Sequence, residues 1–355
     1  MIAGVRSASV PPMHFEFLKR EELAPTVNRE IEAFLDSQGN SHPFQFPQWI
    51  GNGDQGEEAY CAIARERGEI RWFALCGVVL PVGKRLRRIR SLMIYRGPVC
   101  DDAKVTLGGL DELLKKSKES GFAYVEIAPD WVEGSEGEGS VASRLASNGW
   151  QELPDRRSSL RLDLMVGPDE LLSSFRKTTR YEIRRSEQQG VVIRRAEDEG
   201  DLAEFHRIYF EMARKKNFVG GEPSHLLHVL RWIAAEKDRG ALLLAFKNAA
   251  LLGGTLVVRA AKRSWYVFGA TTKDDRLSAG HLLQWHAIRW AKDSGCADYD
   301  FGGYREEINT GPAMFKRGFC QRVVQFSPAW RYPLNRRLCS LVEFATGARS
   351  KWRNP

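Results

Sequence analysis

The sequence lacks the features that mark a secreted, membrane-spanning or disulfide-bonded protein. No apolar run approaches the roughly 20 residues that span a bilayer. The first 17 residues hold one arginine and two prolines but no apolar core, so we expect no secretory signal. Six scattered cysteines form no Cys-x-x-Cys pair, which favours reduced thiols in a cytoplasmic protein over a disulfide frame or a zinc knuckle.

Histidine is scarce, and several familiar catalytic signatures are missing. Two histidine pairs occur, His225 with His228 and His281 with His286, and neither forms part of a known metal motif, so we predict no metal site. The sequence contains no Gly-x-Ser-x-Gly, His-Glu-x-x-His or P-loop motif. The sequence therefore gives no motif evidence for a serine hydrolase of the α/β type, a zinc peptidase or a P-loop nucleoside triphosphatase.

The positive charge of the chain is concentrated in its second half. Residues 1–150 hold 18 Lys and Arg against 21 Asp and Glu, a balance of −3, whereas residues 151–355 hold 35 against 24, a balance of +11. This asymmetry suggests a polyanionic partner for the C-terminal half, with a solvated basic surface as the alternative. The length of 355 residues is enough for about two domains.

The order of expected strands and helices is the same in the two halves. The first half gives strands at 60–64, 70–80 and 89–95, a helix at 107–120 and a strand at 123–128; the second half repeats this order at 241–246, 251–258, 264–268, 279–293 and 297–301. Each helix ends at a Ser-Gly pair, completed by Gly121 and Gly295. We therefore predict an α/β fold, of the α+β type with mixed sheets, in which two domains share one topology.

The boundary between the two domains is expected beside the alternating strand at 159–164. We predict an N-terminal domain at 1–158, a C-terminal domain at 159–330 and a tail at 331–355 that packs on the first domain. Apolar positions at helical spacing predict helical segments within 168–189 and 199–217, before the second repeat begins.

The most informative motif lies at the end of the second repeat. The strand there runs into Gly302-Gly303-Tyr304, and a helix start at Gly311-Pro312 then presents Lys316. Paired glycines let the backbone approach a ligand and turn N–H groups towards an anion. A lysine one turn into a helix stands where a phosphate or a developing oxyanion would be bound. The alternative interpretation is a tight turn beside a surface lysine.

Two groups of basic residues are candidates for contact with RNA or phosphate. On a helix, Arg176, Arg180 and Arg184 would form one continuous stripe, whose like charges repel unless an anion binds. A solvated helix face paired with nearby glutamates is the alternative. The second group occupies an exposed hairpin connection, where a soluble turn explains it as well as RNA contact does: Lys84, Arg85, Arg87, Arg88 and Arg90.

Several short segments follow the order found in one known family. They are His42-Pro43-Phe44-Gln45 with Trp49, Arg96-Gly97-Pro98-Val99, Thr179-Arg180-Tyr181 with Ile183-Arg184-Arg185, Gly190-Val191, the helix end at 287–295, Asp300-Phe301-Gly302-Gly303, and Phe315-Lys316 with Phe319. This ordered set covers roughly residues 40–330. It resembles the FemABX peptidyltransferases, which use aminoacyl-tRNA to extend peptidoglycan stem peptides.

The resemblance implies two tandem GNAT-like acyltransferase domains with a cleft between them. It implies transfer of an amino acid from aminoacyl-tRNA to an amine of a peptidoglycan precursor. Charged tRNA is then a co-substrate, and we expect no cofactor and no metal. If the acceptor is lipid-linked, the protein would make peripheral contact with the inner face of the membrane.

The resemblance also assigns roles to individual residues. Lys316 matches the family's catalytically important lysine, and Arg214 with Phe218 matches its precursor-binding arginine and aromatic residue, with Lys215 as an equal alternative to Arg214. The attacking amine must lose a proton, for which Asp300 is our candidate base. Further substrate contacts are expected from these residues: Arg96, Tyr266, Phe268, Gly302, Gly303, Tyr304 and Phe315.

The chain departs from the family at defined positions. Ile50-Gly51-Asn52-Gly53 stands where the family has a phosphate-binding lysine, and the coiled-coil arm of some members is absent. GNAT enzymes that bind coenzyme A carry Q/R-x-x-G-x-G/A before their central helix, whereas the segment 276–281 has Gly280 one place late. A coenzyme-A-dependent N-acyltransferase of a polysaccharide or amino-sugar pathway is the alternative function, and a catalytically silent scaffold or RNA-binding protein is a third.

Overall fold

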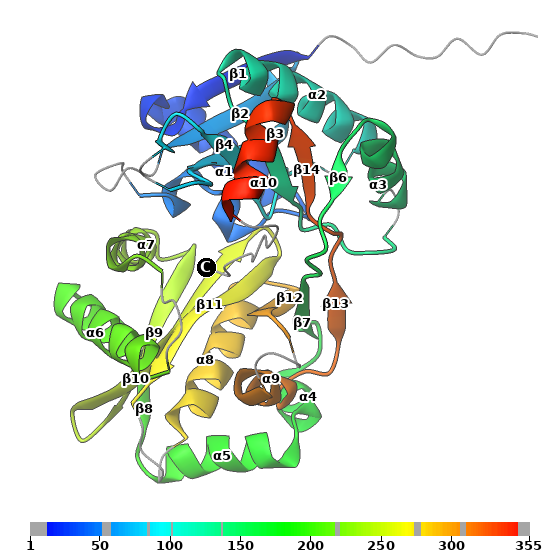
Figure 1. The fold of residues 1–355 in the computed structure, drawn as a ribbon. Coiled ribbons are helices and arrows are strands. Elements are labelled where there is room, and N and C mark those ends of the chain that lie inside the picture. The colour runs from blue at the N-terminus through cyan, green and yellow to red at the C-terminus, as the bar shows by residue number, and fades with distance from the viewer. Residues whose placement is uncertain are drawn as a thin grey trace, which may run out of the picture.

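The structure is a computed structural model that describes residues 13–51, 58–83, 86–100, 102–135, 138–216, 221–272, 278–305 and 310–346. It consists of two lobes, each built on a seven-stranded sheet (Figure 1). Lys84, Arg85, Phe218 and part of the segment 276–281 lie outside the described residues. Among the helices that the structure describes, none has the length and apolar character needed to cross a bilayer.

The N-terminal lobe receives one strand from the far end of the chain. It contains β1 (His14–Lys19), η1 (Arg20–Glu22), α1 (Pro25–Ser37), η2 (Pro43–Gln45), η3 (Pro47–Trp49), β2 (Ala59–Glu66), β3 (Glu69–Val79), β4 (Ser91–Tyr95), α2 (Ala103–Glu119), β5 (Tyr124–Ala128), α3 (Glu138–Ser147), β6 (Gln151–Glu152), β14 (Trp330–Pro333) and α10 (Arg336–Thr346). The strand order is β1-β2-β3-β4-β5-β14-β6. β4 and β5 are parallel because α2 returns the chain between them, and the other paired strands are antiparallel.

The C-terminal lobe repeats this plan. It contains β7 (Ser158–Asp163), α4 (Pro168–Ser174), α5 (Lys177–Gln188), β8 (Val192–Arg195), α6 (Glu199–Lys216), α7 (Pro223–Ala235), β9 (Gly240–Lys247), β10 (Ala250–Ala260), β11 (Arg263–Thr271), α8 (Ala279–Asp293), β12 (Asp298–Gly303), α9 (Thr310–Arg317) and β13 (Val323–Gln325). The strand order is β13-β7-β12-β11-β10-β9-β8, with β11 and β12 parallel across α8. Three antiparallel strands, a helix and a parallel strand thus occur in both lobes, which confirms the predicted duplication.

The segment predicted to be helical at 168–189 is two helices. Phe175 and Arg176 are extended between α4 and α5. Phe175 is buried, and the Arg176 N–H donates to the Gly318 carbonyl at 2.9 Å instead of continuing a helix. Arg176 therefore precedes the first turn of α5, and the arginine stripe expected on one helix begins outside it.

The two sheets share one hydrophobic core. Alternate residues of β9 point to opposite faces, so Leu242 and Leu244 join α6 and α7, while Leu243 lies on the α8 side. The α6 and α7 side is continuous with the N-terminal lobe, because Phe46, which lies between η2 and η3, and residues of α1, β2 and β3 belong to the same core cluster. The opposite face of the N-terminal sheet packs separately against α2 and α3.

Replacing Phe46 tests whether this shared core makes the two lobes unfold together. Phe46 is fully buried, with its ring centroid 6.1 Å from that of Trp232 and 4.3 Å from the guanidinium of Arg239. Phe46→Ala should lower the free energy of unfolding by about 3–5 kcal/mol in urea titrations while one transition is kept. The exposed control, Phe344→Ala, should change it by less than about 0.5 kcal/mol. Two separate transitions, with only one shifted, would contradict the prediction.

Candidate active site

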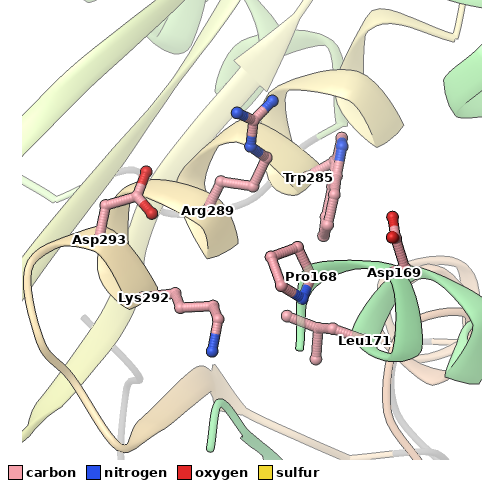
Figure 2. A pocket seen from close by; sticks show the side chains of 7 residues that line it. All are labelled: Pro168, Asp169, Leu171, Trp285, Arg289, Lys292 and Asp293. Atoms are coloured by element: carbon pink, nitrogen blue, oxygen red, sulfur yellow. The ribbon is translucent and has the colours of Figure 1, made fainter. Parts of the chain in front are cut away.

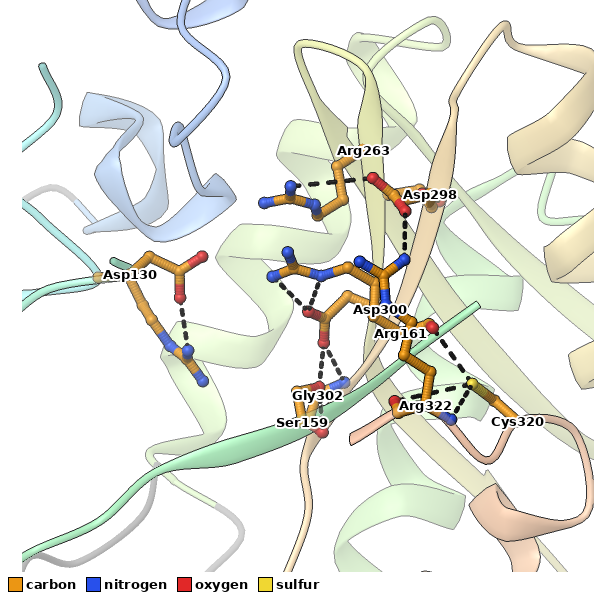
Figure 3. Close-up of polar contacts among 11 residues, drawn as sticks. Asp130, Ser159, Arg161, Arg263, Asp298, Asp300, Gly302, Cys320 and Arg322 are labelled. Atoms are coloured by element: carbon orange, nitrogen blue, oxygen red, sulfur yellow. Dashed lines mark hydrogen bonds and ion pairs between the residues drawn. The ribbon is translucent and has the colours of Figure 1, made fainter. Parts of the chain in front are cut away.

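The strand β12 ends in a turn held by a buried carboxylate. Gly302 has a φ of 69°, a conformation that glycine adopts without steric cost. Its N–H donates to Asp300 Oδ1 at 2.8 Å. The Ser159 hydroxyl, from the neighbouring strand β7, lies against the same carboxylate and 2.8 Å from the Gly302 carbonyl oxygen (Figure 3). The Gly302 amide is therefore used within the turn and is not directed at a ligand.

The second oxygen of Asp300 faces Arg161. The Arg161 guanidinium approaches Asp300 Oδ2 at 3.3 and 3.4 Å, and both side chains are almost fully buried. Both carboxylate oxygens of Asp300 thus have protein partners. This arrangement fixes the Gly302-Gly303 backbone and leaves the residue poorly placed to take a proton from a substrate.

Lys316 reaches the end of this turn from α9. Its ammonium donates to the Gly303 carbonyl at 2.6 Å and lies 6.0 Å from the centroid of the Tyr266 ring. Burial lowers the pKa of Lys316 to about 8, although the Asp300 charge opposes the shift. The structure therefore brings together Lys316 of α9, Asp300 and Gly303 of β12, and Tyr266 of β11.

The neighbouring aromatic residues Phe315 and Tyr304 both pack against the core beside α9. Phe315 packs on His281 and Phe319, with ring centroids 5.0 and 5.4 Å away. Tyr304 is 6% exposed, and its hydroxyl accepts a hydrogen bond from Arg317 Nε at 2.7 Å. Both residues support α9 more than they line an open surface.

Tyr266 and Phe268 both lie on β11, but they have different surroundings. The Tyr266 ring covers Gly269, where any Cβ would come within 2.3 Å of the tyrosine hydroxyl. Burial raises the pKa of Tyr266 to about 12, so its hydroxyl stays protonated. Phe268 stacks parallel to Trp49 of the N-terminal lobe at 6.3 Å between centroids and meets Tyr209 edge-on. Phe268 therefore forms part of the contact between the lobes.

The remaining predicted binding residues differ in burial and in their distance from this turn. Arg214 and Lys215 are exposed in the last turn of α6. Arg96 is buried at the end of β4 and forms an ion pair of 2.6 Å with Asp130.

The three arginines predicted to contact RNA differ from one another. Arg180 donates to the carbonyls of Ser173 and Phe175 and joins α5 to α4. Arg184 is exposed. Arg176 is also exposed, and its N–H bond to the Gly318 carbonyl brings the start of α5 against the helix that carries Lys316.

Sequence reasoning missed a buried charged cluster that adjoins Asp300. The guanidinium groups of Arg96, Arg157 and Arg161 lie 4.8, 5.8 and 5.8 Å from the centroid of the buried Phe326 ring. Burial and the Arg96 charge lower the pKa of Arg157 to about 10. Burial alone would raise the pKa of Asp130, but the combined charges of Arg96 and the neighbouring His42, Arg161 and Arg263 outweigh burial, and the pKa falls. These residues form no recognisable sequence motif. The alternation of side chains along β7 could have indicated only that Ser159 and Arg161 share one face of that strand.

A pocket of about 300 Å³ lies elsewhere, between α4 and α8 (Figure 2). Its lining residues are Pro168, Asp169, Leu171, Trp285, Arg289, Lys292 and Asp293. Lys292 donates to the carbonyls of Leu164 and Val166, both at 2.6 Å, so its charge joins α8 to the chain entering α4. None of the predicted site residues lines this pocket.

Replacing Asp300 tests its role in holding the turn. Asp300→Asn leaves Arg161 buried without its counter-charge, so the free energy of unfolding should fall by about 3 kcal/mol or more in urea titrations. Asp298→Asn is the matched control on the same strand, because its contacts with Arg263 and Arg322 are 3.8 and 3.9 Å long and part of its side chain is exposed. That change should cost less than about 1 kcal/mol. Equal losses in the two variants would refute a special role for Asp300.

A family model and several relatives match this chain. The model described as an acetyltransferase (GNAT) domain matches residues 173–317. The lipid II:glycine glycyltransferase of Staphylococcus haemolyticus is 23% identical over 89% of this chain and 94% of its own length. The UDP-N-acetylmuramoylpentapeptide-lysine N(6)-alanyltransferase of Weissella viridescens is 25% identical over 60% of this chain and 66% of its own length.

Solved structures show the same tandem arrangement. The crystal structure of FemX superposes with a TM-score of 0.78 at 19% identity and covers 92% of this chain and 100% of its own. A tandem GNAT protein of the clavulanic acid pathway superposes with a TM-score of 0.52 at 10% identity and covers 91% of this chain and 99% of its own. The fold expected from the sequence, two GNAT-like domains in tandem, is confirmed. With its duplicated lobes, this chain shares the tandem GNAT-like fold of FemX, and it is similar over most of its length to the lipid II:glycine glycyltransferases, as the resemblance to the FemABX family predicts.

Proposed function

We propose that this protein transfers an amino acid from aminoacyl-tRNA to an amine of a peptidoglycan precursor. The observation that carries the proposal is the ammonium of Lys316, held at 2.6 Å by the Gly303 carbonyl at the end of β12. The glycyltransferase and alanyltransferase named above are matched by this chain. A reaction of this class needs a fixed cation beside a reactive ester, and Lys316 supplies one.

The reaction requires no covalent intermediate with the protein, because the aminoacyl ester is already activated. The acceptor amine attacks the ester carbonyl carbon, the new C–N bond forms, and the C–O bond to the terminal ribose of the tRNA breaks. The proton lost by the amine passes, through water or the substrate, to the departing ribose oxygen. Holding the amine beside the ester can lower the barrier by about 7–11 kcal/mol.

Lys316 stabilises the negative charge that develops on the ester oxygen. An ammonium has three N–H donors, and the Gly303 carbonyl uses one of them. The others serve the oxyanion, whose charge appears only as the amine attacks. Asp300 acts as a positioning residue, because its oxygens are engaged by Ser159, Gly302 and Arg161.

The basic side chains around α9 hold the polyanionic donor. Arg176 and Arg184 contact tRNA phosphates, since both are exposed and the start of α5 touches Gly318, two residues beyond Lys316. Arg214 and Lys215, at the end of α6, bind the precursor. The buried Arg96 acts through its ion pair with Asp130 and not by direct contact.

Replacing Lys316 tests the oxyanion role. Lys316→Met should lower turnover about 100-fold or more and leave precursor binding nearly unchanged, because the lost interaction forms only in the transition state. Steady-state and single-turnover rates measure the first effect, and isothermal titration with precursor measures the second. Unchanged turnover would reject the role.

The lowered pKa of Lys316 predicts a pH dependence. Below a pH of about 8 the side chain is an ammonium, and above it the neutral amine predominates. Turnover should therefore fall as the pH rises through about 8. Lys316→Arg keeps its charge at higher pH, so whatever activity it retains should not show this fall. A fall at the same pH in both enzymes would assign the titration to another group.

Salt dependence tests the contacts with tRNA. Arg176→Ala and Arg184→Ala should each weaken tRNA binding and reduce the slope of log affinity against log salt by about one. Arg207→Ala is the control, because Arg207 is exposed on α6 but already pairs with Glu204 and Glu211. Unchanged slopes for both α5 variants would place the tRNA elsewhere. Arg180 is left intact, since it joins α4 and α5.

Mass spectrometry tests the reaction itself. The protein is incubated with charged tRNAs and either UDP-linked or lipid-linked precursors, and with acetyl-coenzyme A in a parallel reaction. The proposal expects a precursor mass gain of one or more amino-acid residues that depends on charged tRNA. An acetyl mass gain from coenzyme A, without aminoacyl transfer, would replace it with the alternative function.

A further inference from the structure

A surface on the N-terminal lobe combines exposed apolar side chains with arginines, and the transfer reaction leaves it unused. It is formed by α10 and by residues 86–90, which precede β4, and we call it the α10 surface. Figure 1 shows α10, in red, on the N-terminal lobe, whereas α9 with Lys316 lies on the other lobe. The α10 surface is therefore separate from the candidate active site.

Large apolar side chains are exposed on this surface. Phe344 is 88% exposed, Leu86 47% and Leu341 45%. The other large apolar residues that the structure describes as exposed all belong to the C-terminal lobe: Met165, Tyr181, Val192 and Met314. Among the described residues of the N-terminal lobe, all the exposed large apolar side chains therefore lie on the α10 surface.

The packing of α10 explains why these side chains point outward. Leu338, Cys339 and Val342 form its inner face and pack with Ile89 and Tyr124. The Cys339 thiol donates to the Ala123 carbonyl at 3.2 Å and ties the helix to the sheet. Arg337, Leu341 and Phe344 follow at helical spacing on the opposite side. Packing within the lobe therefore explains the apolar residues on the inner face of α10, but it does not explain the apolar residues on the outer face.

The same surface is positively charged. Four of its arginines are exposed, and within the described residues none of them has an ion pair: Arg87, Arg88, Arg336 and Arg337. Glu343 is the acidic residue of α10. Residues 347–355, which follow α10 in the sequence, carry three further basic residues and no acidic one.

We propose that the α10 surface binds the surface of a bilayer that contains anionic lipids. Phe344, Leu341 and Leu86 would enter the boundary of the acyl chains, while the arginines would contact the headgroups. RNA would satisfy the arginines but would leave three large apolar side chains in water without a partner. A lipid surface uses both kinds of side chain. The inference does not depend on the proposed transfer reaction, because its test measures binding alone.

Flotation with lipid vesicles tests the proposal on the full-length protein. Vesicles of phosphatidylcholine are compared with equimolar vesicles of phosphatidylcholine and phosphatidylglycerol, and binding should require the anionic lipid. The double change of Leu341→Ser and Phe344→Ser, and that of Arg87→Glu and Arg88→Glu, should each weaken binding about tenfold or more. Circular dichroism and urea titration establish that the variants are folded.

Matched variants control for general hydrophobicity and charge. Met165→Ser with Val192→Ser removes two apolar side chains that are 75% and 62% exposed on the other lobe. Lys104→Glu with Arg144→Glu makes the same charge change on exposed positions of α2 and α3. Both controls should bind vesicles as the unaltered protein does.

Three outcomes would overturn the proposal. One is equal binding by the α10 variants and the controls. Another is absence of vesicle binding together with a dimer that the Leu341→Ser and Phe344→Ser change converts to a monomer in sedimentation, which would make the surface a contact between copies. The third is loss of tRNA binding in the Arg87→Glu and Arg88→Glu variant without loss of vesicle binding.

Discussion

The geometry of the candidate active site depends on one buried ion pair. Asp300 faces Arg161 across β12 and β7, and the same carboxylate accepts the Gly302 N–H. That bond holds the turn in which the Gly303 carbonyl meets Lys316. A buried charge pair is weak evidence for stability, but here it specifies one backbone conformation at one strand end. The position of the lysine is thus set by residues from β12 and α9, which are close in the sequence, and by residues of β7, which is distant from both.

The shared core between the lobes provides the second constraint. Phe46 packs with Trp232 and Trp49 stacks on Phe268, so the inner faces of both sheets are fixed against each other. Arg239 of the C-terminal lobe also pairs with Asp36 of α1 at 2.6 Å. An enzyme that relies on proximity needs such rigidity, because small displacements of the reacting groups cost large factors in rate.

The repeated topology and the lysine-bearing motif could be predicted from the sequence, because both rest on local patterns. Strand alternation and the Ser-Gly helix ends defined the duplication, and Gly302-Gly303 with Lys316 defined the turn. The role of Asp300 could not be predicted, since its partners Ser159 and Arg161 stand about 140 residues away in the sequence. The cluster of Arg96, Arg157 and Arg161 around Phe326 could not be predicted for the same reason, because its members come from distant parts of the sequence. The break between α4 and α5 was missed because Phe175 keeps the apolar helical period while its backbone is extended.

The exchange of β14 affects how the chain can fold. This strand lies between β5 and β6 in the N-terminal sheet, yet it follows the entire C-terminal lobe in the chain. During synthesis the second lobe can assemble from one continuous segment, whereas the first stays incomplete until residue 333 has left the ribosome. The lobe made first is therefore the last to be finished, and until then the edge of β5 is open to pairing with other strands.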